Sequence, residues 1–189
     1  MTEHEISRKV ALVGTSSVGK TSILDSYSRR FANDPNISLV REAARVYFTQ
    51  NPHIPITERF EFKHQSAIQD LAMQNEKRAH ESGARSIVTD RSVTDAPAYV
   101  LGHGDKEGSK RLISRVEHWI PTYHTIFLLD PEGVPYVQDE IRQETPEVRL
   151  RNHEAFLELF ESEKIIYELL SGTLDQRTRR VDEVVLFKR

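Results

Sequence analysis

Short apolar runs and longer amphipathic stretches alternate along the whole chain. Five runs are apolar and short enough to be buried strands, namely residues 10–13, 37–40, 86–89, 124–129 and 181–187. Between them, apolar residues recur at helical spacing, which predicts helices over residues 23–31, 41–48, 58–83, 112–119 and 153–172 and a further one from residue 94. Strands that alternate with helices in this way predict an α/β fold with a parallel sheet covered on both faces.

Glycine and proline divide this pattern into elements. Residues 49–57 contain two prolines and are expected to form an ordered loop rather than a helix. Residues 102–108 are rich in glycine and charge, which predicts a mobile surface turn. Gly83 and Gly172 each follow an amphipathic stretch, so we expect them to cap the carboxyl ends of two helices.

Length and composition limit the class of protein. The 189 residues fit one domain over positions 1–189, and the formal net charge of −3 gives no reason to expect a nucleic acid or membrane partner. The chain has no apolar run near the length of a membrane span, its first residues lack a secretory core, and it has no cysteine. We therefore expect a cytoplasmic protein. The oligomeric state stays open, a homodimer included.

The most specific motif follows the first predicted strand. Residues 14–21 read Gly-Thr-Ser-Ser-Val-Gly-Lys-Thr, which is the pattern G-x-x-x-x-G-K-[ST] of a phosphate-binding P-loop, and they lead into an amphipathic stretch. In such a loop the backbone N–H groups surround phosphate oxygens at the positive end of a helix, the lysine reaches the β- and γ-phosphates, and the hydroxyl coordinates Mg²⁺. The expected cofactor-binding residues are Gly14, Thr15, Ser16, Ser17, Val18, Gly19, Lys20, Thr21 and Ser22.

The alternative to a P-loop is a glycine-rich turn with an exposed lysine. The strand, loop and helix signals agree with one another at this point, which favours a nucleoside-triphosphate site. We expect ATP and Mg²⁺ as its ligands, with Thr21 and Asp90 on the metal ion, because an aspartate that ends an apolar strand downstream of a P-loop is the usual partner of the metal. Asp90 could instead cap the helix expected from residue 94.

Other polar residues follow the second and third predicted strands. Ligands of open α/β sheets bind beyond the carboxyl ends of the strands, so Glu42 and Arg45, one helical turn apart, would face the same crevice as the P-loop. An exposed surface ion pair is an equally good interpretation of these two residues. Arg91 directly follows Asp90 and is suited to bidentate binding of phosphate.

A polar segment at residues 135–151 carries arginines among acidic residues. The three arginines, Arg142, Arg149 and Arg151, would suit a lid that closes over the triphosphate, and a solvated mixed-charge helix is the alternative. Gln74 and Glu76, taken alone, are expected to be solvated positions of a helix. The eight histidines show no metal-ligand spacing, so we expect them to be ordinary surface or core residues.

Several of these motifs occur in an order that resembles the NadR-like P-loop family, which includes the ribosylnicotinamide kinase domain of NadR. The motifs are the P-loop, Glu42-Ala-Ala-Arg45, a helix with Gln74 and Glu76, Thr89-Asp90, Gln138-Asp-Glu-Ile-Arg142 and Tyr167-x-x-x-Ser171-Gly172. The resemblance covers nearly the whole chain. The segment Asp90-Arg91-Ser92, followed by Asp95 and Tyr99, is also similar to a segment of thymidylate and deoxynucleoside kinases.

The resemblance implies a three-layer P-loop NTPase fold with a five-stranded parallel sheet in the order 2-3-1-4-5 and an arginine-bearing lid. It implies that Glu42 orients or deprotonates an acceptor hydroxyl and that Asp90 lies near Mg²⁺. It also implies that Arg142 and Arg149 touch the transferred phosphate. The third strand reads Thr89-Asp90-Arg91 where kinases of the family often have Asp-Thr-Asp, so the identity of the acceptor stays open.

These observations together predict a small-molecule kinase that transfers the γ-phosphoryl group of ATP to a nucleoside- or nucleotide-like acceptor. The expected catalytic residues are Lys20, Glu42, Asp90, Arg91, Arg142 and Arg149, and the expected acceptor-binding residues are Glu42, Arg45, Asp90 and Arg91. The rival interpretation is a nucleotide-dependent switch or slow NTPase without a small-molecule acceptor. A nucleic-acid-handling ATPase is weaker, since the chain has neither a net basic charge nor a basic stripe with interleaved aromatic residues.

Overall fold

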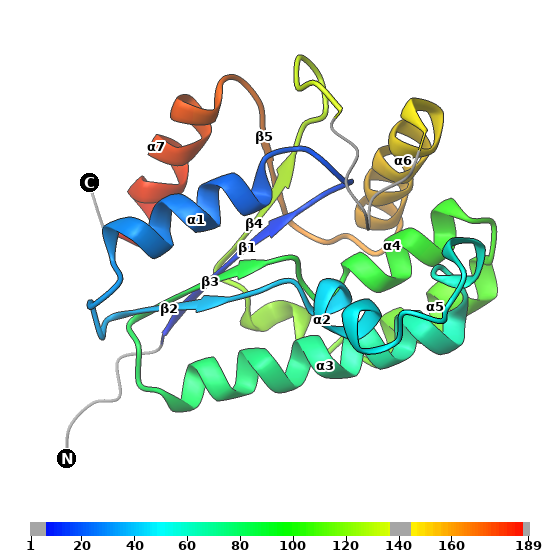
Figure 1. Ribbon diagram of the computed structural model, residues 1–189, viewed down its shortest axis with the longest axis horizontal. Coiled ribbons are helices and arrows are strands. Elements are labelled where there is room, and N and C mark those ends of the chain that lie inside the picture. The colour runs from blue at the N-terminus through cyan, green and yellow to red at the C-terminus, as the bar shows by residue number, and fades with distance from the viewer. Residues whose placement is uncertain (1–6, 137–144, 187–189) are drawn as a thin grey trace.

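A parallel sheet of five strands lies at the centre of the computed structural model, which describes residues 7–136 and 145–186. The strands are β1 (Arg8–Val13), β2 (Ile37–Val40), β3 (Ser86–Asp90), β4 (Thr125–Leu129) and β5 (Glu168–Leu170). Their order is β2-β3-β1-β4-β5, and every neighbouring pair is parallel (Figure 1). The predicted fold class and strand order are therefore confirmed.

Helices connect the strands and cover both faces of the sheet. The α-helices are α1 (Lys20–Arg30), α2 (Ala43–Gln50), α3 (Phe62–Glu81), α4 (Asp95–Gly102), α5 (Lys106–Ser114), α6 (Pro146–Ser162) and α7 (Leu174–Val185). Two short 3₁₀ helices, η1 (Ile56–Glu58) and η2 (Ile120–Thr122), lie in the connections. No helix within the described residues is both long enough and apolar enough to cross a membrane.

The alternation of side chains along each strand builds two cores, one on each face. Leu12 and Phe127 point to the face covered by α1 and α7, where Tyr27 and Val181 pack with them. The neighbouring positions of the same strands point to the opposite face, covered by α3, α4, α5 and α6 (Figure 1). Both faces of the sheet are therefore buried under helices, as expected for a parallel sheet.

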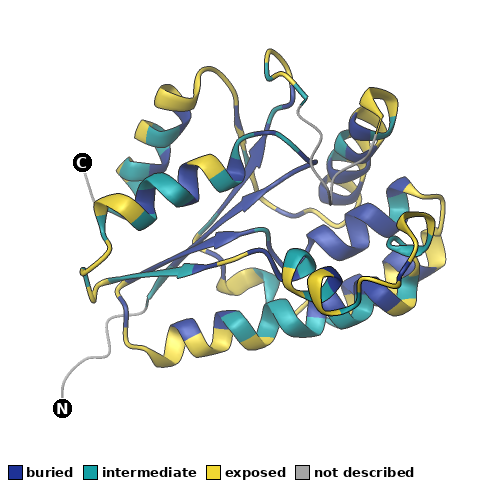
Figure 2. Cartoon of the chain, in the orientation of Figure 1, coloured by how far each residue is buried: buried dark blue, intermediate teal, exposed yellow. Residues whose placement is uncertain are grey.

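Helix α4 is the most deeply buried helix that Figure 2 shows, and it begins just after the carboxyl end of β3. Seven of its eight residues are buried, including Asp95 at its first position. It packs against α6, α5 and α3. A charged residue at the start of a buried helix is held in one place, which matters for the site described below.

The carboxyl-terminal third of the chain differs from the sequence prediction. The expected helix over 153–172 ends at Ser162, and residues 168–170 form the fifth strand. Residues 181–185 of the strand expected over 181–187 belong to helix α7. The predicted helix cap at Gly172 is also wrong, because this glycine lies between β5 and α7 with φ +91°. A three-residue strand is too short to show a period of two, so residues 165–170 fit a helical pattern equally well.

Local capping explains two further differences. The side chain of Asp105 accepts a hydrogen bond from the Gly108 amide at 2.7 Å, so α5 begins within the stretch expected to be a surface turn. Thr145 caps α6 and Pro146 occupies its first position, where proline loses no helical hydrogen bond. The last residues of the predicted lid are thus helical, and residues 137–144 lie outside the described part of the chain. The predicted cap at Gly83 agrees with its φ of +77° just after α3.

Candidate functional site

The loop between β1 and α1 has the backbone that its glycines permit. Gly14 adopts φ +129°, and a Cβ atom there would lie 3.1 Å from the carbonyl oxygen of Leu129 on β4. Gly19 adopts φ +93° and is the N-cap of α1, and Ser17 between them has φ +55°. Only glycine adopts the first two conformations without strain, so the spacing of the motif follows from the path of this loop.

Lys20 turns back into the loop that precedes it. Its Nζ atom donates hydrogen bonds to the carbonyl oxygens of Gly14 at 2.8 Å and Thr15 at 2.6 Å, and the side chain is buried. Burial, with a smaller contribution from the charge of Arg91, lowers the pKa of Lys20 to about 7. The ammonium group therefore lies inside the loop, and an anionic ligand there would favour its charged form.

Thr21 and Asp90 meet between α1 and the end of β3. The Thr21 hydroxyl donates to Asp90 Oδ2 at 2.9 Å, while Asp90 Oδ1 is buried and has no hydrogen-bond partner among the described residues. Burial, followed by the charge of Glu42, raises the pKa of Asp90. A buried carboxylate oxygen without a donor beside a hydroxyl fits the ligand set of a hard divalent cation such as Mg²⁺. The alternative that Asp90 caps α4 is wrong, because Thr94 is the N-cap of that helix.

The other residues expected in the P-loop differ in how far they are buried. Thr15, Ser16 and Val18 are buried, Ser17 and Thr21 are partly buried, and Ser22 is exposed on the first turn of α1. The Thr15 hydroxyl has no hydrogen-bond partner among the described residues. Buried hydroxyls that lack a partner are suited to a polar ligand in the loop.

Arg91 is the hub of a buried ionic network. It has φ +80°, a left-handed conformation that costs free energy for a residue with a Cβ atom. Its guanidinium group donates to Glu42 Oε1 at 2.6 Å, to Asp95 Oδ1 at 2.9 Å and to the hydroxyl of Tyr99 at 3.1 Å. It also donates to the carbonyl of Gly14 at 3.2 Å, which ties the network to the P-loop.

Glu42 and Arg45 differ in how far they enter the site. Glu42 follows β2 as the N-cap residue of α2 and is buried against Arg91, as the crevice interpretation predicts. The side chain of Arg45 is 43% exposed, with its Nε atom 3.9 Å from Glu42 Oε2. Glu42 is therefore not part of an exposed surface pair, whereas Arg45 is largely exposed. Both residues line one cleft.

This cleft opens beside the P-loop, beyond the carboxyl ends of β2 and β3. Its walls come from the start of α2, the residues between η1 and α3, one side of α3 and the first turns of α4. Aromatic, aliphatic and amide side chains line it together with the ionic network, among them Phe48, Phe60, Ile68, Ala72, Gln65, Gln69, Ala96 and Tyr99. An apolar cleft with a few convergent polar groups is typical of a small-molecule site.

Of the two arginines predicted to act from the lid, the structure describes Arg149 but not Arg142. Arg149, on the first turns of α6, is buried and donates to the carbonyl oxygens of Val134 at 2.9 Å and Ser17 at 3.3 Å. It thereby reaches the P-loop from the part of the predicted lid segment that is helical, at the start of α6. Arg142 lies outside the described residues.

Two buried charged residues near the site were not identified from the sequence. Glu76 was expected to be solvated, but it is buried and accepts hydrogen bonds from Lys9 at 2.7 Å, Trp119 at 2.8 Å and Tyr123 at 2.6 Å. Arg177 of α7 donates to the carbonyl of Val18 in the P-loop at 3.1 Å. Glu76 lies on the cleft side of its helix, in line with Ile68 and Ala72. This spacing, and the place of Glu76 among the motifs of the family resemblance, were the signals available in the sequence.

A family model described as an AAA domain matches residues 9–177. The chain belongs to this AAA-domain family. No curated protein matches the sequence.

Solved structures of NadR share the fold of this chain. A NadR structure in complex with NAD and AMP-PNP is 18% identical at a TM-score of 0.71, over 98% of this chain and 51% of the NadR chain. A NadR structure in complex with NR is 17% identical at the same TM-score, over 96% of this chain and 52% of the other. This AAA-domain chain therefore spans about half the length of the NadR chains.

Two shorter kinases match over almost their entire length. Deoxyadenosine kinase from M. mycoides, solved with the products dCMP and a flexible dCDP, is 13% identical at a TM-score of 0.61, over 92% of this chain and 96% of the kinase. Thymidylate kinase from Ehrlichia chaffeensis is 14% identical at a TM-score of 0.61, over 94% of this chain and 98% of the kinase. At these identities the likeness establishes that the AAA-domain chain has the fold of P-loop kinases.

Proposed function

We propose that this protein is an ATP- and Mg²⁺-dependent kinase that phosphorylates a hydroxyl or phosphate group of a nucleoside- or nucleotide-like acceptor. The observation that carries the proposal is that the P-loop and the cleft adjoin each other. Asp90, which accepts a hydrogen bond from Thr21 beside the P-loop, lines the same cleft as Glu42 and Arg91. A phosphate donor in the loop and an acceptor in the cleft would therefore meet at the ionic network.

The donor half of the site would bind the triphosphate. The amides of residues 14–19 and the ammonium group of Lys20 would hold its phosphates, and Thr21 and Asp90 would hold Mg²⁺. Bound there, Mg²⁺ and ATP supply the transferable γ-phosphoryl group and the positive charge that stabilises it. Lys20 would exchange its two carbonyl partners for phosphate oxygens as the nucleotide binds.

The acceptor half would position the group that receives the phosphate. Glu42 would orient the acceptor hydroxyl or take its proton, with Arg45 beside it, and Arg91 would bind phosphate oxygens. Arg142 and Arg149 would stabilise the charge on the transferring group from the side of the predicted lid. Most of the rate enhancement would come from positioning and from electrostatic stabilisation.

The structural neighbours support this class of acceptor. The two NadR structures were solved with NAD and NR, and the deoxyadenosine kinase with dCMP and dCDP, so each of these ligands contains a nucleoside or nucleotide. A cleft that combines Phe60 and Tyr99 with amide and ionic groups suits a flat base together with a polar sugar. A switch protein needs an exposed nucleotide-sensitive surface instead of such a cleft.

A panel assay tests the proposal. Nucleosides, nucleoside monophosphates and ribosylnicotinamide are each incubated with the protein, ATP and Mg²⁺, and ADP release is compared with the rate without acceptor. At least one acceptor should raise ADP release and yield a phosphorylated product detectable by mass spectrometry, and Lys20→Ala should remove the increase. If no acceptor raises the background rate while the nucleotide still binds, the protein is a nucleotide switch or slow NTPase.

A further inference from the structure

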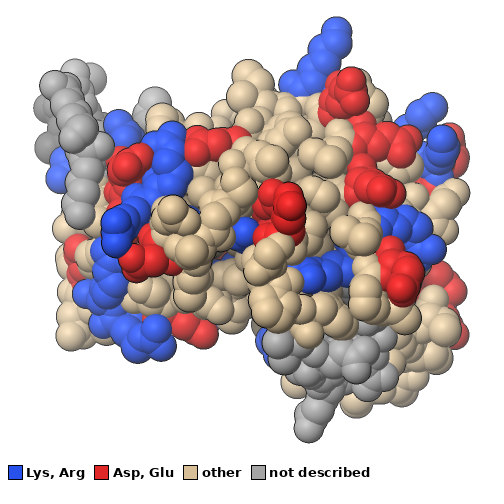
Figure 3. Space-filling view, turned by 90° about the horizontal axis from the view of Figure 1, so that it is seen from above, with Lys and Arg blue, Asp and Glu red and all other residues tan. Residues whose placement is uncertain are grey.

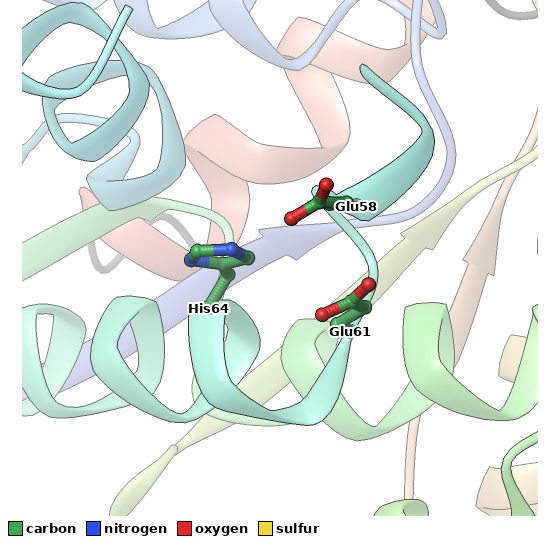
Figure 4. A group of neighbouring side chains, drawn as sticks. All are labelled: Glu58, Glu61 and His64. Atoms are coloured by element: carbon green, nitrogen blue, oxygen red, sulfur yellow. The ribbon is translucent and has the colours of Figure 1, made fainter. Parts of the chain in front are cut away.

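A second group of ligand-type side chains lies at the amino end of α3. Glu58 ends η1, Glu61 is the N-cap residue of α3, and His64 lies in its first turn. Each offers one ligand atom, and these atoms all lie within 4.8 Å of one another. Figure 4 shows the two carboxylates and the imidazole turned toward a common space.

His64 provides a second and independent observation. The residue is only 9% exposed, and its Nε2 atom is buried with no hydrogen-bond partner among the described residues. Its Nδ1 atom lies 3.0 Å from the hydroxyl of Tyr47 on α2. An imidazole with one nitrogen held by a protein group and the other left for a ligand is the arrangement that metal-binding histidines adopt. A metal ion would also relieve the free-energy cost of a buried nitrogen without a partner.

Lys63 shows that the two carboxylates already attract a cation. Its Nζ atom lies 2.9 Å from Glu61 Oε2 and 3.4 Å from Glu58 Oε2. The lysine side chain is 60% exposed, so it can turn into solvent without the cost of opening a packed core. A cation that also binds His64 would make three contacts where the ammonium makes two.

We propose that Glu58, Glu61 and His64 bind one divalent transition-metal ion, with Zn²⁺ as the preferred occupant. Two carboxylate oxygens and one imidazole nitrogen suit Zn²⁺ better than Mg²⁺, which prefers oxygen ligands alone. Ligand atoms of a tetrahedral zinc site lie about 3.4 Å apart, so the cluster closes by roughly an ångström as the ion binds. Three protein ligands leave the fourth position to water. A count of histidines alone misses this cluster, because two of its ligands are carboxylates.

The position of the cluster links it to the cleft. Arg59 and Phe60 lie between its ligands in the sequence, and both line the cleft. The ring of Phe60 stacks on Tyr99 at 5.6 Å and on His103 at 3.8 Å between centroids. An ion that fixes the segment from Glu58 to His64 would therefore fix this wall of the cleft.

The test measures metal binding directly and needs no catalytic activity. The protein is titrated with Zn²⁺ by calorimetry and with Co²⁺ by visible absorption, without nucleotide. The wild type should bind one equivalent, and His64→Gln and Glu61→Gln should each weaken binding by at least about tenfold. Glu81→Gln, on the last turn of the same helix, is the matched control and should bind as the wild type does.

Two further variants make the test specific. Lys63→Met removes the competing ammonium and should tighten Zn²⁺ binding, while Tyr47→Phe removes the partner of Nδ1 and should weaken binding about tenfold. Circular dichroism of each metal-free variant verifies that it folds. Absence of stoichiometric binding to the wild type, or equal affinity in His64→Gln, would overturn the proposal and leave the proposed kinase activity untouched. Metal binding at this cluster in a protein without kinase activity would support the metal site and count against the proposed kinase function.

Discussion

At the scale of single residues, the site consists of buried charges held by one another. Asp90 ends β3, Glu42 follows the neighbouring strand β2, and Arg91, which follows Asp90 in a left-handed conformation, donates a hydrogen bond to Glu42. Such strain is retained only where surrounding contacts determine the backbone, and here four hydrogen bonds from the guanidinium group do so. The residue is therefore placed for contact with a ligand at the expense of local stability.

Asp90→Asn separates a role in metal binding from a role in folding. Burial already disfavours the charged form of Asp90, so a neutral amide of equal size should leave the unfolding transition nearly unchanged. If Asp90 binds Mg²⁺, the variant should lose about 10- to 100-fold in activity with the best acceptor. Steady-state kinetics and thermal unfolding measure both effects. Asp105→Asn, at the cap of α5, is the control, and unchanged turnover in Asp90→Asn would contradict the assigned role.

The buried pair of Lys9 and Glu76 allows a prediction with a defined pH dependence. Glu76→Gln leaves the buried ammonium of Lys9 without its counter-charge, which should lower the free energy of unfolding by about 3–5 kcal/mol at pH 7. Burial lowers the pKa of Lys9 below 10.5, and loss of the carboxylate lowers this pKa further. Lys9 of the folded variant then loses its proton at lower pH than in the unfolded chain, so stability recovers as pH rises toward 10.

Urea unfolding at pH 7 and at pH 9.5 measures this effect. The gap between wild type and Glu76→Gln should narrow at the higher pH, because the uncharged amine of Lys9 needs no counter-charge. Glu81→Gln, which removes an exposed partner of Lys77, should stay within about 0.5 kcal/mol of wild type at both values. A gap that widens with pH would mean that the ammonium is not the source of the instability.

At the scale of elements, two arginines attach helices to the back of the P-loop. Arg149 of α6 donates to the carbonyl of Ser17, and Arg177 of α7 donates to the carbonyl of Val18. Each arginine also donates to a carbonyl just after β4, Arg149 to that of Pro131 and Arg177 to that of Asp130. The two arginines therefore tie the P-loop to α6, to α7 and to the end of β4.

Arg177→Ala should therefore affect both stability and nucleotide binding. Three carbonyl groups, of Val18, Asp130 and Gly172, lose a donor in a buried place, at about 1 kcal/mol or more each. We expect a loss of at least about 3 kcal/mol in the free energy of unfolding together with a raised KM for ATP. Arg179→Ala, on the same helix, removes only an exposed pair with Asp175 and is the control. Equal stability of the two variants would show that Arg177 is not a structural link.

These elements also show how far the sequence is informative. Residues 14–21 carry a motif whose backbone is dictated by two glycines, so the loop, β1 and α1 could be predicted before the fold was known. The three residues of β5 and the role of Arg177 on α7 could not. Arg177 donates to the backbone carbonyls of Val18 and Asp130, which are distant in sequence, and a carbonyl carries no sequence signal. Glu76 was misinterpreted because its side-chain partners Lys9 and Tyr123 are brought to it only by the fold.

At the scale of the whole molecule, opposite charges nearly balance, with a formal net charge of −3. Acidic and basic side chains are interspersed on the face that Figure 3 shows. A few charged residues are buried instead, in the network around Arg91 and in the pair of Lys9 and Glu76. If the proposed site binds a phosphate-bearing ligand, recognition should depend on these buried groups rather than on long-range attraction, and salt should weaken it only modestly.

The stability of the whole chain should report whether ATP and Mg²⁺ bind this site. A ligand at 100 times its dissociation constant that binds only the folded state adds about 2.7 kcal/mol. For a chain of this size, each kcal/mol raises Tm by roughly 2–4 °C, so saturating Mg²⁺ with a non-hydrolysable ATP analogue should raise Tm by about 5–10 °C. Thermal unfolding with analogue alone, with Mg²⁺ alone and with both distinguishes the contributions. Lys20→Ala should lose most of the shift and Asp90→Asn the Mg²⁺-dependent part, because Lys20 lies within the loop and Asp90 beside Thr21. A shift that is the same in wild type and in both variants would locate nucleotide binding elsewhere on the protein.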